Sequence, residues 1–175
     1  MAGVNREYDS YGNLKSEQFE INGKKYGECK TYYPTGQLYE IYTCIDGKRN
    51  GELKRYDYTG LIRDSISYVN NNIDGKYLSY ENGQLQYVCT YIDGKKNGEY
   101  IQYYPNGNLT YSIMFIDDKK NGECKRYYPN QQLQEMCTFI DDKRNGEYKL
   151  YDRRSNLIQQ SIWKNDKKLK VEILN

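Results

Sequence analysis

A phrase of acidic, basic, asparagine and glycine residues recurs along the chain and has the residue types of a ligand-binding loop. It reads IDGKRNGE at 45–52, IDGKKNGE at 92–99, IDDKKNGE at 116–123 and IDDKRNGE at 140–147, with a looser INGKKYGE at 21–28. A phosphate-binding loop would need Gly-Lys-Ser/Thr before a helix, which the phrase lacks. A calcium loop would need alternating oxygen ligands, and lysines stand where ligands should be. We therefore interpret the phrase as a turn between structural units, and expect no metal and no cofactor.

Residues suited to acid–base or nucleophilic catalysis are scarce. There is no histidine, the usual proton acceptor near neutral pH. One glutamate recurs once per unit at the start of an expected strand, which favours a structural role over a catalytic one: Glu28, Glu52, Glu99, Glu123 and Glu147. The cysteines are odd in number and lack zinc-knuckle or redox spacing, so they are expected to be reduced packing residues: Cys29, Cys44, Cys89, Cys124 and Cys137. The sequence predicts no enzyme and no catalytic residue.

The elements that position the phrase follow from its period. Its closing glycine recurs every 23 or 24 residues, at Gly3, Gly27, Gly51, Gly75, Gly98, Gly122 and Gly146. A fixed period of this size indicates a repeat architecture. We call the segments that begin at these glycines repeats 1 to 7. Together they predict a single repeat domain over residues 1–175, with 170–175 as a closing strand.

Each repeat contains two strand signals and two turn signals. The first strand is expected to start at the anchoring glycine and to end in a Tyr-Tyr pair, before a turn such as PTGQ or PNGN. The second strand is expected to run from a fixed Leu or Ile to the next phrase, which forms the return turn. Because no room remains for a helix, the fold class is all-β: seven tandem hairpins stacked into one elongated, twisted antiparallel sheet.

The sequence does not decide which side chains of the first strand point toward the core. Leu53 illustrates an apolar position of repeats 2 to 7, and Tyr56 a tyrosine position of every repeat; the two have opposite parity along the strand. Alternating side chains would place them on opposite faces unless a bulge intervenes. Either a bulge is present, or both faces carry aromatic residues.

Two rows of side chains are candidate binding surfaces. A tyrosine row could bind a protein partner, stack on unpaired bases or simply form the core; it comprises Tyr32, Tyr33, Tyr56, Tyr80, Tyr103, Tyr104, Tyr127, Tyr128 and Tyr151. A row of basic pairs in the expected turns could meet an anionic surface; it comprises Lys48, Arg49, Lys95, Lys96, Lys119, Lys120, Lys143 and Arg144. Acidic residues flank each pair, which favours ordinary solvated turns.

Charge and hydropathy narrow the possible partners and compartment. The chain has 26 basic and 24 acidic residues, so no global field for nucleic acid is expected. No apolar run approaches the roughly 20 residues that a membrane span requires. The first ten residues, MAGVNREYDS, lack the basic start and apolar stretch of a signal peptide. The sequence therefore predicts an intracellular, cytoplasmic protein that is not secreted and has no transmembrane segment.

The motifs YYPNGNL at 103–109 and IDDKKNGE at 116–123 resemble the membrane occupation and recognition nexus (MORN) repeat, in the variant form of bacterial and giant-virus proteins. The resemblance covers about Gly3 to Lys170. It implies a hairpin array without catalytic activity that serves scaffolding, oligomerisation or association with membranes and phosphoinositides. Some bacterial members are antitoxin-like, and a viral origin would place the protein in the host cytoplasm or the virion. The usual Trp of the first strand is replaced here by Cys, Leu or Tyr.

The leading hypothesis is a non-enzymatic scaffold that binds an unidentified protein partner, or a second copy of itself as a homodimer, through an aromatic sheet face. One alternative is peripheral binding to anionic phospholipid through the basic row. Another is an antitoxin-like binding protein. Nucleic acid is not expected as a partner because the charges nearly balance.

Overall fold

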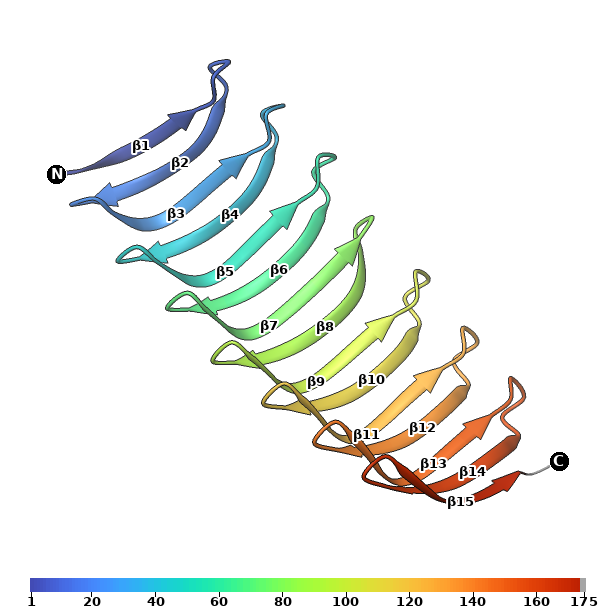
Figure 1. The fold of residues 1–175 in the computed structure, drawn as a ribbon. Coiled ribbons are helices and arrows are strands. Elements are labelled where there is room, and N and C mark those ends of the chain that lie inside the picture. Colours follow the sequence, from blue (N-terminus) through green and yellow to red (C-terminus); the bar gives the residue numbers. More distant parts are fainter. Residues whose placement is uncertain (174–175) are drawn as a thin grey trace. The chain divides into compact units, whose positions relative to one another are not determined.

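The computed structural model describes residues 1–173, which form fifteen β-strands and no helix (Figure 1). The strands follow one another in chain order in one open antiparallel sheet, which confirms the predicted all-β fold. No helix in residues 1–173 is long and apolar enough to span a bilayer. The strands are β1 (Ala2–Tyr8), β2 (Leu14–Ile21), β3 (Lys24–Tyr32), β4 (Leu38–Ile45), β5 (Lys48–Tyr56), β6 (Ile62–Val69), β7 (Asn72–Glu81), β8 (Gln84–Ile92), β9 (Lys95–Tyr103), β10 (Leu109–Ile116), β11 (Lys119–Tyr127), β12 (Leu133–Ile140), β13 (Lys143–Tyr151), β14 (Leu157–Lys164) and β15 (Lys167–Ile173).

By its internal contacts the chain divides into two compact units. The N-terminal unit comprises Met1–Gln84 with Tyr91–Gly94, and the C-terminal unit comprises Leu85–Thr90 with Lys95–Asn175. Within each unit the strands are bent along their length (Figure 1). The closing strand β15 begins at Lys167, and residues 174–175 of the segment predicted to close the sheet lie outside the described residues.

The recurring phrase is a two-residue turn followed by a bulge, so the prediction that the turn extends to the anchoring glycine is wrong. Asp46 and Gly47 both have positive φ (52° and 77°), as a type I′ hairpin turn requires. β5 therefore begins at Lys48, three residues before the anchoring Gly51. Asn50 and Gly51 lie inside the strand, where the register shifts between β4 and β5. Gly51 has a φ of 95°, which explains why a glycine recurs at a position that is not a turn.

A second bulge occurs at the other end of six of the hairpins, β7–β8 not among them, and decides which side chains share a face. Arg55 pairs with Asp64, whereas the next residue, Tyr56, pairs with Ile62. The extra residue, Arg63, therefore lies on β6 and not on β5. Since β5 has no bulge between Leu53 and Tyr56, alternation makes Tyr56 point away from the face that carries Leu53. Both faces of the sheet carry aromatic residues.

One face, which we call the core face, holds the buried apolar side chains of both units. In the N-terminal unit these are Cys29, Tyr42, Cys44, Leu53 and Ile66. In the C-terminal unit they are Ile113, Phe115, Cys124 and Cys137. All five cysteines of the chain are free and buried, as the packing interpretation predicts. Strand alternation places glutamate–lysine pairs on the opposite face, for example Glu52 with Lys54, whose charged atoms lie 3.1 Å apart.

Candidate binding face

The tyrosines predicted to bind a partner are all half-buried. Three of them make the same contact between neighbouring repeats: the Tyr33 hydroxyl donates to the carbonyl of Tyr56 (2.9 Å), and Tyr104 and Tyr128 donate likewise to Tyr127 (2.7 Å) and Tyr151 (2.9 Å). These hydroxyls therefore help to stack successive hairpins. A role of the tyrosine row in partner binding stays a prediction.

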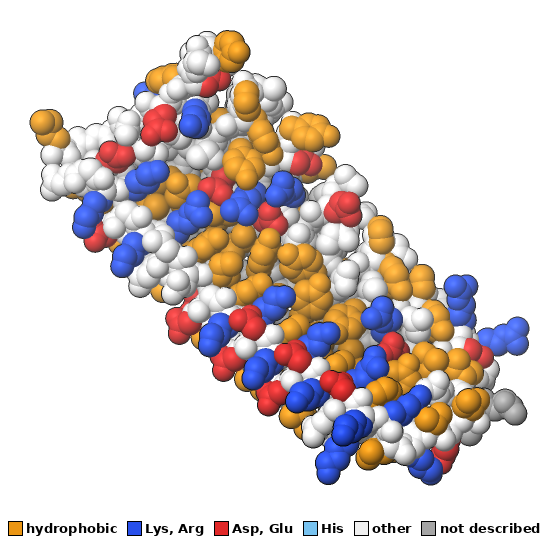
Figure 2. All heavy atoms as spheres, in the orientation of Figure 1, with side chains coloured by type: hydrophobic (Ala, Val, Ile, Leu, Met, Phe, Trp, Pro, Cys, Tyr) orange, Lys and Arg blue, Asp and Glu red, His pale blue; other side chains and the backbone are white. Residues whose placement is uncertain are grey.

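The basic pairs lie at the start of strands, not in turns, because the two-residue turn ends before the first lysine. The first members are exposed at the ends of their strands, beside the hairpin turns, along what we call the turn edge: Lys48, Lys95, Lys119 and Lys143. Along that edge basic and acidic side chains alternate (Figure 2). For example, Lys95 Nζ lies 3.9 Å from a carboxylate oxygen of Asp117. The predicted anionic-surface row is thus partly neutralised by its neighbours.

The second members of the pairs are half-buried on the core face. Their cationic groups lie over aromatic rings: Arg49 at 4.6 Å from the Tyr42 centroid, Lys96 at 5.2 Å from Phe115, Lys120 at 5.3 Å from Phe139 and Arg144 at 5.1 Å from Trp163. A cation over a ring face is attracted by the ring quadrupole. The structure therefore separates each predicted pair into one edge cation and one face cation.

The backbone of each face cation is held by the turn of the next repeat. The backbone N–H of Lys96 donates to the Asp118 carboxylate, and that of Lys120 donates to Asp142, each at 2.8 Å. In return the Asp118 N–H donates to the Lys96 carbonyl at 2.9 Å. These contacts hold the backbone of the residue that carries each face cation, so the side chain extends from a fixed point over the core face.

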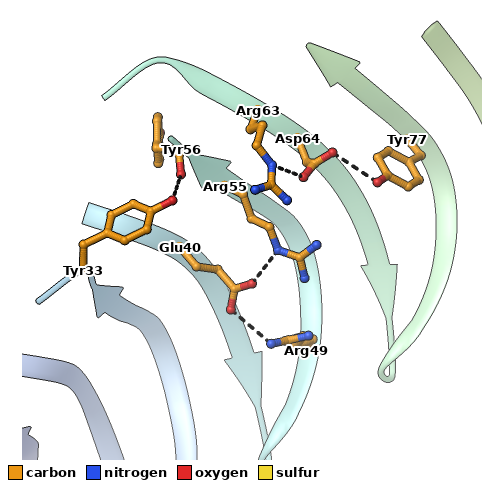
Figure 3. A network of polar contacts seen from close by, with 8 residues as sticks. All are labelled: Tyr33, Glu40, Arg49, Arg55, Tyr56, Arg63, Asp64 and Tyr77. Atoms are coloured by element: carbon orange, nitrogen blue, oxygen red, sulfur yellow. Dashed lines mark hydrogen bonds and ion pairs between the residues drawn. The ribbon is translucent and has the colours of Figure 1, made fainter. Parts of the chain in front are cut away.

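A buried carboxylate neutralises the face cations of the N-terminal unit (Figure 3). Glu40 accepts from Arg49 Nη2 at 3.1 Å and from Arg55 Nε at 2.9 Å, and its side chain is only 7% exposed. Burial acts to lower the pKa of Arg55, but the hydrogen bond and charge of Glu40 outweigh it, so the pKa is raised. Asp64 on β6 similarly accepts from the Tyr77 hydroxyl at 3.1 Å. Sequence reasoning missed both acids, although each stands between apolar residues at alternate positions of a strand.

The C-terminal unit has no such carboxylate at the corresponding place between β10 and β11. Tyr111 pairs with Arg126 there, and Phe115 pairs with Lys120. A cavity of about 340 Å³ opens at this point and is lined by Lys96, Tyr111, Lys120 and Arg126 among others. Burial raises the pKa of Tyr111, which keeps its hydroxyl neutral. Of the predicted basic residues, Lys96 and Lys120 meet here, whereas Lys95 and Lys119 are not part of the lining.

The buried thiols differ in acidity: hydrogen bonds with Cys137 and Tyr111 lower the pKa of Cys124 to about 7, whereas the pKa values of Cys29, Cys89 and Cys137 are raised. Burial raises the pKa of Cys29 to about 12, and burial also raises the pKa of Cys89. Cys124 and Cys137 are direct cross-strand partners, and the hydrogen bond with Cys124 together with burial raises the pKa of Cys137. A raised pKa keeps a thiol protonated and a poor nucleophile. Among residues 1–173 no three His, Cys, Asp or Glu side chains converge as ligands for a metal ion.

Comparison with known proteins gives a family match and weak structural likenesses. The model of the MORN repeat variant matches residues 25–43, 74–93, 96–117 and 120–141. No curated protein matches the sequence. A crystal structure of TarM is 11% identical, covers 54% of this chain and 19% of its own length, and has a TM-score of 0.37. A TcdB2–TccC3–Cdc42 structure is 13% identical, covers 94% of this chain and 11% of its own, with a TM-score of 0.27.

This chain spans less than a fifth of the length of those two structures, and the TM-scores are too low to carry an argument about function. The family match is different, because its four segments fall in the same register of the hairpin repeat. The MORN repeat is a non-enzymatic repeat type. The resemblance read from the sequence is thereby confirmed: the MORN repeat variant model matches four repeats spread along the chain.

Proposed function

We propose that the protein is a non-enzymatic repeat scaffold that binds an acidic protein surface through the core face of its C-terminal unit. The observation that carries the proposal is the row of cations held over aromatic rings on that face: Lys96, Lys120, Arg126 and Arg144. Every described element belongs to the sheet, so within residues 1–173 no second layer packs on this face.

The residue types of the face suit a protein interface. Tyrosine, tryptophan and arginine are enriched among the residues that contribute most to binding energy. Half-buried rings such as Tyr148 and Trp163 would supply contact area, while the cations above them would select a partner of opposite charge. The same charges argue against two copies meeting face to face, since like charges would oppose one another.

Binding to anionic lipid is the second candidate, and it rests on the exposed edge lysines. The side chains of Lys24 and Lys95 are more than half exposed. However, each of these lysines has an aspartate of the following turn as its ion-pair partner: Lys24 Nζ lies 2.7 Å from Asp46. A membrane would have to displace these pairs, so the edge is a weaker candidate than the core face.

The two surfaces can be separated with charge-reversal variants. A face variant carries Lys96→Glu and Arg144→Glu, and a matched edge variant carries Lys95→Glu and Lys143→Glu. We expect proteins captured by the wild type and identified by mass spectrometry to be lost with the face variant and kept with the edge variant. A captured partner should be acidic where it binds, and its affinity should fall with added salt.

Equal binding of the partner to the face variant and the wild type would contradict the proposal. Co-sedimentation of wild type and both variants with vesicles that contain anionic phospholipid tests the second candidate. Loss of vesicle binding in the edge variant alone, together with no partner lost from the face variant, would favour the lipid surface instead.

A further inference from the structure

Two pairs of adjacent strands provide an internal comparison. In the N-terminal unit Glu40 pairs with Arg55, and Cys44 pairs with Arg49. In the C-terminal unit Tyr111 pairs with Arg126, and Phe115 pairs with Lys120. The register therefore matches Lys120 with Arg49 and Arg126 with Arg55. The two cations are present in both units, but the carboxylate between them is replaced by Tyr111.

The place of that carboxylate is open in the C-terminal unit. The cavity of about 340 Å³ lies where Lys120, Arg126 and Tyr111 converge, with Lys96 from β9 as a third cation. Its volume falls within the range of small-ligand sites. Gln102 and Thr110 add polar groups to the lining. The Thr110 hydroxyl oxygen is buried and has no hydrogen-bond partner in the described part of the chain.

The cations of the cavity are held in position, and among them only Arg126 has a carboxylate partner within residues 1–173. Lys96 and Lys120 form no ion pair with a carboxylate of residues 1–173, and Arg126 Nε lies 3.8 Å from Glu135, at the limit of an ion pair. Asp118 and Asp142 are near, but each accepts from the backbone N–H of a lysine. The rings keep the head groups in place, since Lys96 Nζ lies 5.2 Å from the Phe115 centroid and Arg126 Cζ lies 5.6 Å from that of Tyr111.

We propose that this cavity is a binding site for an oxyanion, a carboxylate or a phosphate, that bridges Lys120 and Arg126 as the Glu40 carboxylate bridges Arg49 and Arg55. The planar guanidinium of Arg126 suits two-point contact with either group, and the lysines contribute further charge. The oxyanion comes either from a free small molecule or from an acidic side chain of a bound protein. The site does not require that the whole face bind a protein.

The test is a titration of the full chain followed by amide NMR at constant ionic strength in chloride. Three probes are added separately: inorganic phosphate, acetate and a hexaglutamate peptide. We expect saturable shifts at Lys96, Lys120 and Arg126 in the wild type. Tyr111→Glu places an internal carboxylate in the cavity and should weaken phosphate binding about tenfold or more.

Two further variants keep the test independent of how well Tyr111→Glu folds. Arg126→Met removes one of the bridged cations and should weaken binding about as much. Lys119→Met removes an exposed edge cation next to the site and should leave binding unchanged. Acetate and phosphate binding without peptide binding points to a free oxyanion, whereas tighter binding of the peptide points to an acidic side chain; both outcomes support the site.

The proposal is overturned if the wild type shows no saturable shift with any probe. It is also overturned if shifts are spread equally over all lysines and arginines, or if Arg126→Met binds phosphate as the wild type does. Phosphate binding at this cavity combined with no effect of the face variant on partner capture would keep the oxyanion site and reject the protein-binding function. The two ideas therefore fail separately.

Discussion

The N-terminal and C-terminal units have the same strand pairing but differ in how the cations of the core face are neutralised. In the first, Glu40 is almost fully buried and joins Arg49 and Arg55. In the second, Tyr111 occupies the equivalent register beside Arg126, and a cavity lined by cations takes the place of the ion pair. The same hairpin repeat thus places a carboxylate beside the two cations of β5 and a tyrosine beside the two equivalent cations of β11.

The difference shows that the repeat determines the backbone pairing, whereas side chains on the core face vary from repeat to repeat. Glycines at turns and bulges, contacts between successive turns and the tyrosine hydroxyls recur in both units, since they satisfy backbone groups that any such sheet must satisfy. A single side chain on the core face can change from Glu to Tyr without disturbing these contacts. Binding properties can therefore change from repeat to repeat while the fold persists.

The largest expected effect concerns the fully buried aliphatic side chain in each unit. Leu53 is 0% and Ile113 is 1% exposed, and truncation of either to alanine leaves a cavity. We expect Leu53→Ala and Ile113→Ala each to lower the free energy of unfolding by about 2–5 kcal/mol. Urea unfolding monitored by circular dichroism would measure both. A loss well below this range in only one variant would show that the two units are not packed equally well.

The second effect distinguishes the units directly. Glu40→Gln removes the charge that two half-buried arginines share, and we expect a loss of about 2–3 kcal/mol. The matched change Glu135→Gln affects one contact of 3.8 Å at a more exposed carboxylate, and should cost less than about 1 kcal/mol. The same urea experiment compares them. Equal losses would mean that the contrast between the units has no energetic basis.

A smaller effect is expected for the hydroxyl contacts between repeats. Tyr33→Phe and Tyr104→Phe each remove one hydrogen bond to a carbonyl and should cost about 1 kcal/mol, alike in the two units. Tyr11→Phe is the control, because Tyr11 is 90% exposed. If thermal unfolding shows Tyr33→Phe and Tyr11→Phe to be indistinguishable, the contact does not stabilise the stack.

The smallest effect has the opposite sign. Ser155 occupies a turn position with a φ of 68°, where four other repeats have a glycine. Ser155→Gly should raise stability by up to about 1 kcal/mol, since glycine adopts this conformation without strain. Gln131 also has a φ of 68°, but its side chain accepts from the Leu109 N–H and donates to the Leu109 carbonyl. Because Gln131→Gly relieves the strain but loses these hydrogen bonds, its effect on stability should be nearly neutral. Calorimetry would rank the two, and a reversed order would refute this reasoning.

Much of the fold could be predicted from the sequence because its period is so regular. The hairpins, their number and the packing role of the cysteines follow from repeated spacing. The starts of the strands could not be predicted, because Asp46-Gly47 and Asn50-Gly51 look equally like turns. Both pairs contain a glycine with positive φ, yet only the first reverses the chain while the second forms a bulge.

The candidate site was harder to predict, for a physical reason. Sequence patterns placed Lys119 and Lys120 together as one basic pair, but adjacent residues of a strand point to opposite sides. Only Lys120 reaches the cavity, where it meets Arg126 from its own strand and Lys96 from β9. The absence of a carboxylate among them becomes visible only when the register of β10 and β11 is compared with that of β4 and β5.

The most direct test of the account exchanges the two side chains that distinguish the units, in one variant that carries both Glu40→Tyr and Tyr111→Glu. Phosphate is titrated into the full chain, and amide shifts are followed at Arg49 and Arg55 and at Lys120 and Arg126. If the frame is shared and this one position controls the site, saturable binding will leave the β10–β11 cavity and appear between β4 and β5. Binding that stays at Lys120 and Arg126 in a folded exchange variant would contradict the account.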